Sequence, residues 1–328
     1  MRTNAKLYVA LLLGGLLSLN AQCQSPASRS GTAAAATTAD PVFEGLKYKY
    51  PVRKVTLPDG QIIAYVDQGK GPQTIILIHG LGSYLPAWNK NIPELSQHYR
   101  IIALDLPGYG KSSKENAQVG MKAYADAVLA LMDELKIEKA VLAGHSMGGQ
   151  VAITAALQAP ERVQQLILAA PAGLETFTEQ QKQLFKATVT PESIAKTTPE
   201  QIAANIKVNF FQMPADAQFM VEERVEMLNS AQFPDYSQAV AQGVASMVDE
   251  PVHDKLPQLQ VPTLILFGEN DALIPNRYFN PTLTTKAVAD IGKERIPNSQ
   301  VVLLPQVGHM LQFEQPEAFN KAVRDFLD

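Results

Sequence analysis

The sequence of 328 residues has one cysteine, no excess of basic residues and no apolar stretch long enough to cross a bilayer comfortably. One cysteine excludes a disulfide within the chain, and no group of Cys and His residues has the spacing of a metal site. The net charge of -4 gives no basic surface for a nucleic acid. A Gly-rich phosphate-binding loop is also missing after the first expected strand. We therefore expect no nucleic-acid partner, no metal and no cofactor.

The N-terminus has the pattern of an exported protein. Arg2 and Lys6 precede the apolar run Leu7–Leu17, which has the length of a signal-peptide core. This pattern predicts a signal peptide over residues 1–21. The Ser, Ala and Thr content that follows predicts a flexible linker over residues 22–45. We expect a periplasmic, secreted or envelope-anchored protein.

Cys23 lies just after the apolar run, which is where bacterial lipoproteins carry their lipid-modified cysteine. Leu19 fits such a signal with one residue of slack, whereas Gln22 stands where a small residue is expected. Lipidation of Cys23 would give the protein a membrane association. The alternative is cleavage after Ala21, which leaves Cys23 as a free thiol near the start of the mature chain.

The motif Gly144-His145-Ser146-Met147-Gly148 directly follows an apolar run of strand length, residues 139–143. A strand that ends at Gly144 and a helix that opens after Ser146 place the serine on a sharp turn with small neighbours. Its hydroxyl then lies above the sheet, beside a helix N-terminus that favours negative charge. This context predicts a nucleophile. The alternative is a serine that caps an ordinary helix.

A second apolar run, residues 74–78, ends at the glycine-flanked turn His79-Gly80-Leu81-Gly82. Such a turn exposes backbone N–H groups, and acyl transfer needs fixed donors for the oxyanion of its tetrahedral intermediate. We assign two donors to the backbone amides of Leu81 and Met147. His79 is expected to be structural, with a ring that hydrogen-bonds the loop.

Two later strand-like runs each lead to a residue that would form a triad with Ser146. Residues 262–267 precede Asp271, which would accept the Nδ1–H of a histidine and hold its tautomer. Glu269 is the competing acid in the same loop. The second run precedes His309, the predicted general base, because a histidine takes and returns a proton near neutral pH.

Together these segments resemble the α/β-hydrolase family over roughly residues 54–327. The resemblance is carried by five short segments, namely His79-Gly80, Asp105–Ser112, Gly144–Gly148, the loop of Asp271 and Gly308-His309. Nucleophile, acid and histidine follow one another in the order of that family.

The resemblance implies an α/β fold, with a mostly parallel sheet flanked by helices, and a catalytic triad of Ser146, Asp271 and His309. It also implies that Asp105 is a structural carboxylate that braces its loop. The interval between acid and histidine, residues 276–297, is longer than the family pattern, which leaves the local helix geometry open. The fold alone does not select a substrate.

Alternating apolar residues on both sides of Pro58-Asp59-Gly60 predict an antiparallel hairpin over residues 52–66. Buried-type strands then alternate with helical patterns, as in a parallel sheet covered by helices. One long interval has no strand pattern and consists of Pro-punctuated helical sequence. We expect a core of residues 46–171 and 254–328, with a helical cap, residues 172–253, inserted between its two parts.

A cap over Ser146 would exclude water and shape an apolar acyl pocket. Most of the cap's aromatic residues are expected to form its own small core. The candidates for substrate contact are Trp88, Phe210, Phe211, Met213 and Phe219, together with Tyr84.

The sequence thus predicts a serine hydrolase that cleaves a small-molecule or lipid ester with an apolar acyl group through an acyl-enzyme. One alternative is a carbon–carbon bond hydrolase of vinylogous diketones, which uses the same triad. Export disfavours it, because such catabolic substrates are usually cytosolic. The other alternative is a noncatalytic binding module on the same fold, which the complete triad disfavours. No residue pattern specifies esterase against lipase, or an oligomeric state.

Overall fold

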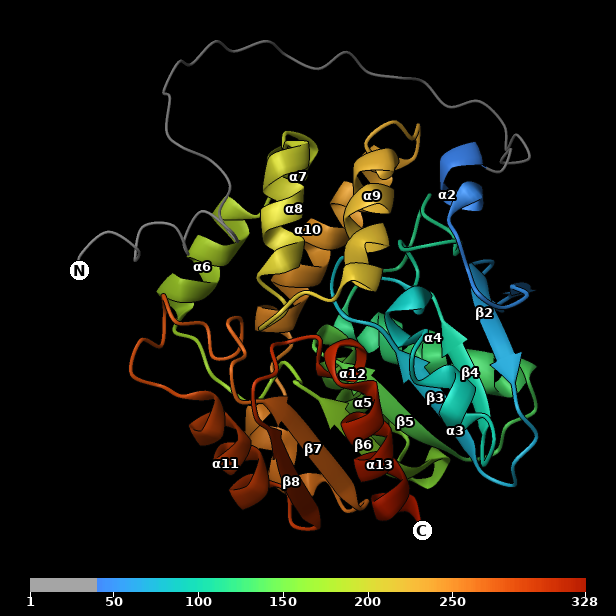
Figure 1. Ribbon diagram of the computed structural model, residues 1–328, viewed down its shortest axis with the longest axis vertical. Helices are drawn as coiled ribbons and strands as arrows, with labels where there is room; N and C mark the ends of the chain where they lie inside the picture. The colour runs from blue at the N-terminus through green and yellow to red at the C-terminus, as the bar shows by residue number, and fades with distance from the viewer. Residues whose placement is uncertain (1–39) are drawn as a thin grey trace.

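The computed structural model describes residues 40–328, and its centre is a sheet of eight strands (Figure 1). In spatial order the strands run β1-β2-β4-β3-β5-β6-β7-β8. Their bounds are β1 Arg53–Thr56, β2 Ile62–Gln68, β3 Thr74–Ile78, β4 Arg100–Leu104, β5 Ala140–His145, β6 Val163–Ala169, β7 Thr263–Gly268 and β8 Ser299–Leu304.

β1 and β2 form the predicted antiparallel hairpin, with Arg53 opposite Tyr65 and Thr56 opposite Ile62. At its turn Gly60 has a φ of 87°, which a glycine adopts without steric strain. β2 also pairs antiparallel with β4, and the remaining neighbours are parallel. The loops after β3, β5, β7 and β8 therefore gather at one edge of the sheet, where open α/β sheets place their sites.

Helices pack against the sheet, whose inner strands are buried along most of their length. The helices of the core after β1 are α3 Ile92–Leu95, α4 Met121–Glu134, α5 Met147–Gln158, α11 Thr285–Arg295, α12 Leu311–Glu314 and α13 Pro316–Leu327, with 3₁₀ turns η1 Leu85–Trp88, η2 Pro160–Arg162 and η4 His253–Gln258. The predicted mostly parallel α/β fold is confirmed. Among residues 40–328, none of the helices is both long and apolar enough to cross a bilayer.

Between β6 and β7 the chain leaves the sheet and forms the cap, drawn in yellow-green to orange at the top of Figure 1. Its elements are α6 Glu179–Thr188, α7 Pro191–Ala195, α8 Pro199–Lys207, η3 Ala215–Ala217, α9 Gln218–Met227 and α10 Phe233–Asp249. Three helices begin with a capping box, in which Thr178, Thr190 or Thr198 exchanges hydrogen bonds with the residue three positions on. These local signals fix where α6, α7 and α8 start.

The long interval between acid and histidine contains α11, which packs on β7 and β8. Thr284 caps this helix by accepting a hydrogen bond from the Ala287 amide at 3.1 Å. The interval is long because it holds a complete connecting helix together with an extended loop, residues 269–284, at the edge of the site.

The prediction of a flexible linker over residues 22–45 is wrong at its end. Residues 41–45 form helix α2 Pro41–Gly45, whose N-cap Asp40 accepts hydrogen bonds from the Val42 and Phe43 amides. Phe43 is 1 % exposed, and burial of an aromatic ring on a neighbouring surface holds a short helix that would not persist alone. The predicted signal peptide, Cys23 and the rest of the linker lie outside the described residues.

Candidate active site

Ser146 lies on the sharp turn between β5 and α5, with φ 55° and ψ -118°. The turn is crowded from both sides. A Cβ on Gly144 would lie 2.1 Å from the Gly148 carbonyl oxygen, and a Cβ on Gly148 would lie 2.4 Å from that of Ile78. Both distances are far below a van der Waals contact, so this backbone forms because glycine occupies both positions.

The two amides predicted as oxyanion donors flank this serine. Met147 is the first residue of α5, so its N–H is one of the helix-terminal donors that lack an intrahelical acceptor. Leu81 belongs to the turn after β3, where a Cβ on Gly80 would lie 3.1 Å from the Ser146 Cβ. Both amides therefore come from segments next to Ser146, and the Met147 amide lies at the positive end of the α5 dipole.

His309 and Asp271 come from the loops after β8 and β7 and form a hydrogen bond of 2.8 Å between Nδ1 and Oδ2. The other carboxylate oxygen of Asp271 accepts the Leu273 and Ile274 amides at 2.8 and 2.9 Å. Since a carboxylate accepts from Nδ1–H, this bond leaves Nε2 of His309 as the basic atom. The competing acid Glu269 is exposed, whereas Asp271 is fully buried.

His145 packs against His309, with ring centroids 4.7 Å apart, and its Nε2–H donates to the His309 carbonyl at 3.0 Å. Burial, together with the charge that His309 takes on when protonated, holds the pKa of His145 well below its ordinary value. His145 therefore remains neutral and supports the backbone of the base. Sequence reasoning gave this residue no role, because only the fold brings the two histidines together.

His79 is structural, as predicted. Its Nδ1–H donates to the Gly80 carbonyl at 2.8 Å, and its Nε2 accepts from the Leu106 amide at 3.0 Å. Full burial lowers the pKa of His79 to about 4, so the ring is neutral at physiological pH. It ties the turn after β3 to the loop after β4.

Asp105 braces that loop, also as predicted. Its fully buried carboxylate accepts from the Leu85 amide at 2.7 Å, the Lys111 amide at 2.8 Å and the Tyr48 hydroxyl at 2.5 Å. A Cβ on Gly110 would lie 2.2 Å from this carboxylate, which explains a glycine there. Burial raises the pKa of Asp105, although these donors act in the opposite direction.

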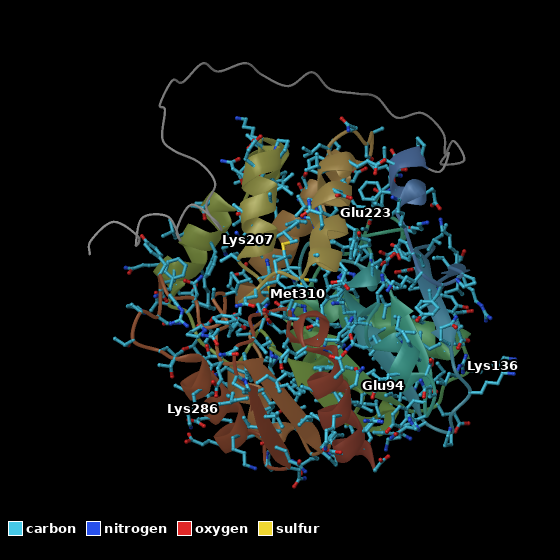
Figure 2. The ribbon with its side chains drawn as sticks, in the orientation of Figure 1. Glu94, Lys136, Lys207, Glu223, Lys286 and Met310 are labelled. Atoms are coloured by element: carbon cyan, nitrogen blue, oxygen red, sulfur yellow. The ribbon has the colours of Figure 1, made fainter. Side chains whose placement is uncertain are left out.

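A cavity of about 590 Å³ lies between the sheet edge and the cap, and Leu81, Ser146 and His309 open onto it. Met310, next to His309, also lines it and lies between cap and core in Figure 2. The cap contributes mainly apolar side chains, including Phe177, Phe185, Phe210, Met220, Val244 and Met247. An apolar chamber over a serine, a histidine and two backbone donors suits a substrate with an apolar part next to a carbonyl.

Of the residues predicted to contact substrate, Phe210 and Tyr84 line this cavity. The residues that line the cavity do not include Trp88, Phe211, Met213 and Phe219. Trp88 is fully buried against Phe319 in the core. Phe211 is 44 % exposed, whereas its neighbour Phe210 is buried.

Met213 and Phe219 lie outside the cavity lining and pack against a small apolar cluster that includes Phe313 of α12. Phe219 and Phe313 have ring centroids 6.1 Å apart within it. These two apolar side chains help to join the cap to the core. The sequence alone does not distinguish this role from that of a residue that lines a pocket.

The sequence does not single out the charged residues of the cavity wall, among which Glu175 and Arg224 are partly or wholly buried. Glu175 accepts the Asn276 amide at 3.1 Å and the Asn280 side-chain amide at 2.9 Å, and burial raises its pKa to about 7. Arg224 extends from α9, and its buried Nε has no hydrogen-bond partner among residues 40–328. A lone Glu or Arg within a helical segment carries no signal that distinguishes it from a solvated surface residue.

Comparison with known proteins gives one family. A model of the α/β-hydrolase fold matches residues 73–316. The dihydrolipoyllysine-residue acetyltransferase component of an acetoin cleaving system from Pseudomonas putida is 34% identical over 264 residues, which are 79% of this chain and 64% of that protein. The chain thus spans less than two thirds of that relative.

Two further relatives match along nearly their whole length. A pimeloyl-[acyl-carrier protein] methyl ester esterase from Aliivibrio fischeri is 29% identical over 80% of this chain and 95% of its own. A 2-hydroxy-6-oxononadienedioate/2-hydroxy-6-oxononatrienedioate hydrolase from Cupriavidus pinatubonensis is 27% identical over 84% of this chain and 94% of its own.

Among solved structures, a probable hydrolytic enzyme from Pseudomonas aeruginosa PAO1 has a TM-score of 0.77 at 27% identity, covering 87% of this chain and 96% of that one. The likeness extends over the sheet and much of the cap, since it includes most of both chains.

Proposed function

Since this chain belongs to the α/β-hydrolase fold family and is a hydrolase, we propose that it is a serine hydrolase that cleaves carboxylic esters with apolar acyl groups. The observation that carries the proposal is the bond between Asp271 and His309 at the edge of the same cavity onto which Ser146 opens. These three groups have the complementary roles of nucleophile, base and orienting acid.

In the proposed reaction the Ser146 Oγ attacks the ester carbonyl carbon, and Nε2 of His309 takes the hydroxyl proton. Asp271 holds the tautomer of His309 and stabilises the imidazolium that forms. The carbonyl oxygen becomes an oxyanion between the amides of Leu81 and Met147. His309 then protonates the leaving alcohol. Water, activated by the same histidine, hydrolyses the acyl-enzyme and restores Ser146.

The proposed substrate class follows from the cavity wall. Phe177, Phe185 and Phe210 would surround the acyl chain with apolar surface, at about 25 cal/mol for each Å² removed from water. The esterase from Aliivibrio fischeri gives this activity a precedent among relatives of similar length.

A second candidate is a carbon–carbon bond hydrolase of vinylogous diketones, and Arg224 favours it. The cavity wall carries the cationic side chains of Lys182, Arg224 and Arg277, and the buried Nε of Arg224 has no hydrogen-bond partner among residues 40–328. A cation at this position suits a substrate that carries a carboxylate. The hydrolase from Cupriavidus pinatubonensis is named for a substrate with an oxo group and two carboxylates. Turnover of a ring-fission dienoate without any ester hydrolysis would select this candidate.

The test of the proposed function is hydrolysis of p-nitrophenyl esters from acetate to palmitate by the wild-type protein and by Ser146→Ala. We expect wild-type turnover that is lost in the variant, with an optimum chain length that separates esterase from lipase. Folded wild-type protein that hydrolyses none of these esters would contradict the proposal.

We also propose that the protein is exported, because Arg2, Lys6 and Leu7–Leu17 have the pattern of a signal peptide. Intact mass of protein extracted from cells tests this. A mature chain that begins at a lipid-bearing Cys23 indicates membrane anchoring, a start at Gln22 indicates release, and an uncleaved Met1 in the cytoplasm contradicts export.

A further inference from the structure

Residues 40–48, named here the N-terminal brace, lie outside the sheet and contact the cap beside the candidate site. The brace comprises Asp40, α2, drawn in blue at the upper right of Figure 1, and the three residues after α2. Asp40 accepts a hydrogen bond from the Ser230 hydroxyl at 2.9 Å, in the connection between α9 and α10. The brace is thus fastened to the cap at its first residue.

A first line of contacts runs from Phe43 through Tyr236 to the turn after β3. The two rings have centroids 6.0 Å apart, and each residue is 1 % exposed. The Tyr236 hydroxyl donates to the Gly82 carbonyl at 3.1 Å. Phe43 therefore packs against Tyr236, whose hydroxyl group is hydrogen-bonded to Gly82.

A second line runs through Glu223, which lies on α9 close to α2 in Figure 2. Its buried carboxylate accepts the Lys47 amide at 2.9 Å with one oxygen and the Tyr84 hydroxyl with the other. Burial of a carboxylate costs free energy unless hydrogen-bond donors satisfy its oxygens. The positions of Lys47, Glu223 and Tyr84 are therefore strongly coupled.

A third line runs through Asp105. The Tyr48 hydroxyl donates to Oδ2 at 2.5 Å, and the Leu85 amide donates to Oδ1 at 2.7 Å. One buried carboxylate thus joins the end of the brace to the first residue of η1.

The three lines of contacts end at Gly82, Tyr84 and Leu85, in the segment that directly follows Leu81. We propose that the N-terminal brace is a positioning element of the active site, which holds the turn that carries the Leu81 oxyanion donor. This inference rests on the proposed serine-hydrolase function. The physical reason is that an oxyanion donor acts only at a narrow range of distances, so a small displacement of the turn weakens catalysis without unfolding the protein.

The test uses the full chain and Tyr48→Phe, which keeps the ring and removes one hydrogen bond to Asp105. The matched control is Tyr99→Phe, which removes the Tyr99 hydroxyl bond to Asp328 on the far side of the protein. We expect kcat for p-nitrophenyl butyrate to fall roughly 3- to 10-fold in Tyr48→Phe, less than the about 100-fold that a 1 Å displacement can cost. KM should stay within about twofold, and the rate of labelling by a fluorophosphonate should fall with kcat, because that reaction uses the same oxyanion donors.

A second variant separates positioning from stability. Phe43→Leu, which refills part of the space, should restore most of the kcat that Phe43→Ala loses, measured well below the melting temperature of each. Lower melting temperatures with wild-type kcat in Tyr48→Phe and Phe43→Ala would overturn the inference and leave the proposed function intact. Absence of ester hydrolysis by wild-type protein would overturn both.

Discussion

His309 Nδ1 lies 2.8 Å from Asp271 Oδ2, and the exposed fractions of the two residues are 3 % and 0 %. A buried bond of this kind sets which ring nitrogen of His309 carries the proton. The first prediction concerns its removal. Asp271→Asn should preserve the shape of the loop and lower kcat for ester hydrolysis by about 10⁴-fold, because an amide N–H facing Nδ1 favours the wrong tautomer.

The matched control for this variant is Glu269→Gln, two residues earlier in the same loop and exposed. It should change kcat less than about twofold, as expected for a surface charge outside the reacting groups. If Glu269→Gln instead abolished turnover and Asp271→Asn did not, the assignment of the acid would be wrong.

The second prediction concerns the crowded serine turn. Gly148→Ala should lower the free energy of unfolding by about 2 kcal/mol or more, since its Cβ would lie 2.4 Å from a backbone oxygen. Gly45→Ala is the control, because a Cβ there meets nothing within 4 Å. Thermal unfolding of both variants tests this, with a drop of about 4 °C or more expected for Gly148→Ala and little change for Gly45→Ala. Equal melting temperatures would refute the account of the turn.

The third prediction uses two adjacent aromatic residues that the sequence did not separate. Phe210→Leu should raise KM for p-nitrophenyl hexanoate roughly threefold. Phe210 lines the cavity, and a leucine there offers the acyl chain less apolar contact area than the aromatic ring does. Phe211→Leu, half exposed and outside the cavity lining, should leave KM unchanged. The acyl chain lies elsewhere if the two variants respond alike.

The fourth prediction is a pH dependence of stability. The pKa of Glu175 is raised to about 7 from 4.5, so the folded state holds a proton that the unfolded state releases. The resulting stabilisation is complete below about pH 4.5 and is lost as the pH rises through about 7. Glu175→Gln has no proton to lose, so its melting temperature relative to wild type should increase between pH 5 and pH 8, by about 2 °C or more.

The experiment for Glu175 is a pair of melting curves at each pH, so that effects common to both proteins cancel. A melting-temperature difference that stays constant from pH 5 to pH 8 would show that the Glu175 carboxylate ionises without penalty in the folded protein.

The features that can be predicted from the sequence are those in which local structural signals and chemistry coincide. The hairpin turn at Asp59-Gly60, the apolar strands and the serine turn are specified by nearby residues, and each has the predicted structure. Asp271 and His309 follow their strands directly, so a parallel sheet necessarily brings them to one edge.

The errors arise where a role depends on contacts between distant segments. Trp88 is large and apolar, which suits a pocket as well as a core, and its contact with Phe319 decides between them. Phe43 lies in a stretch of linker-like composition, yet its ring is buried against Tyr236 from the cap. Glu175 and Arg224 acquire their significance from the cavity around them, which the order of residues does not reveal.

The most direct test of Ser146 as the nucleophile is covalent labelling with a fluorophosphonate, followed by mass spectrometry of the peptide that contains Ser146. If Ser146 is the nucleophile, we expect one phosphonyl group per protein molecule on Ser146, no label on Ser146→Ala, and labelling slowed by several orders of magnitude in His309→Ala. Folded wild-type protein that takes up no label, or a label on another residue with ester hydrolysis retained in Ser146→Ala, would contradict it.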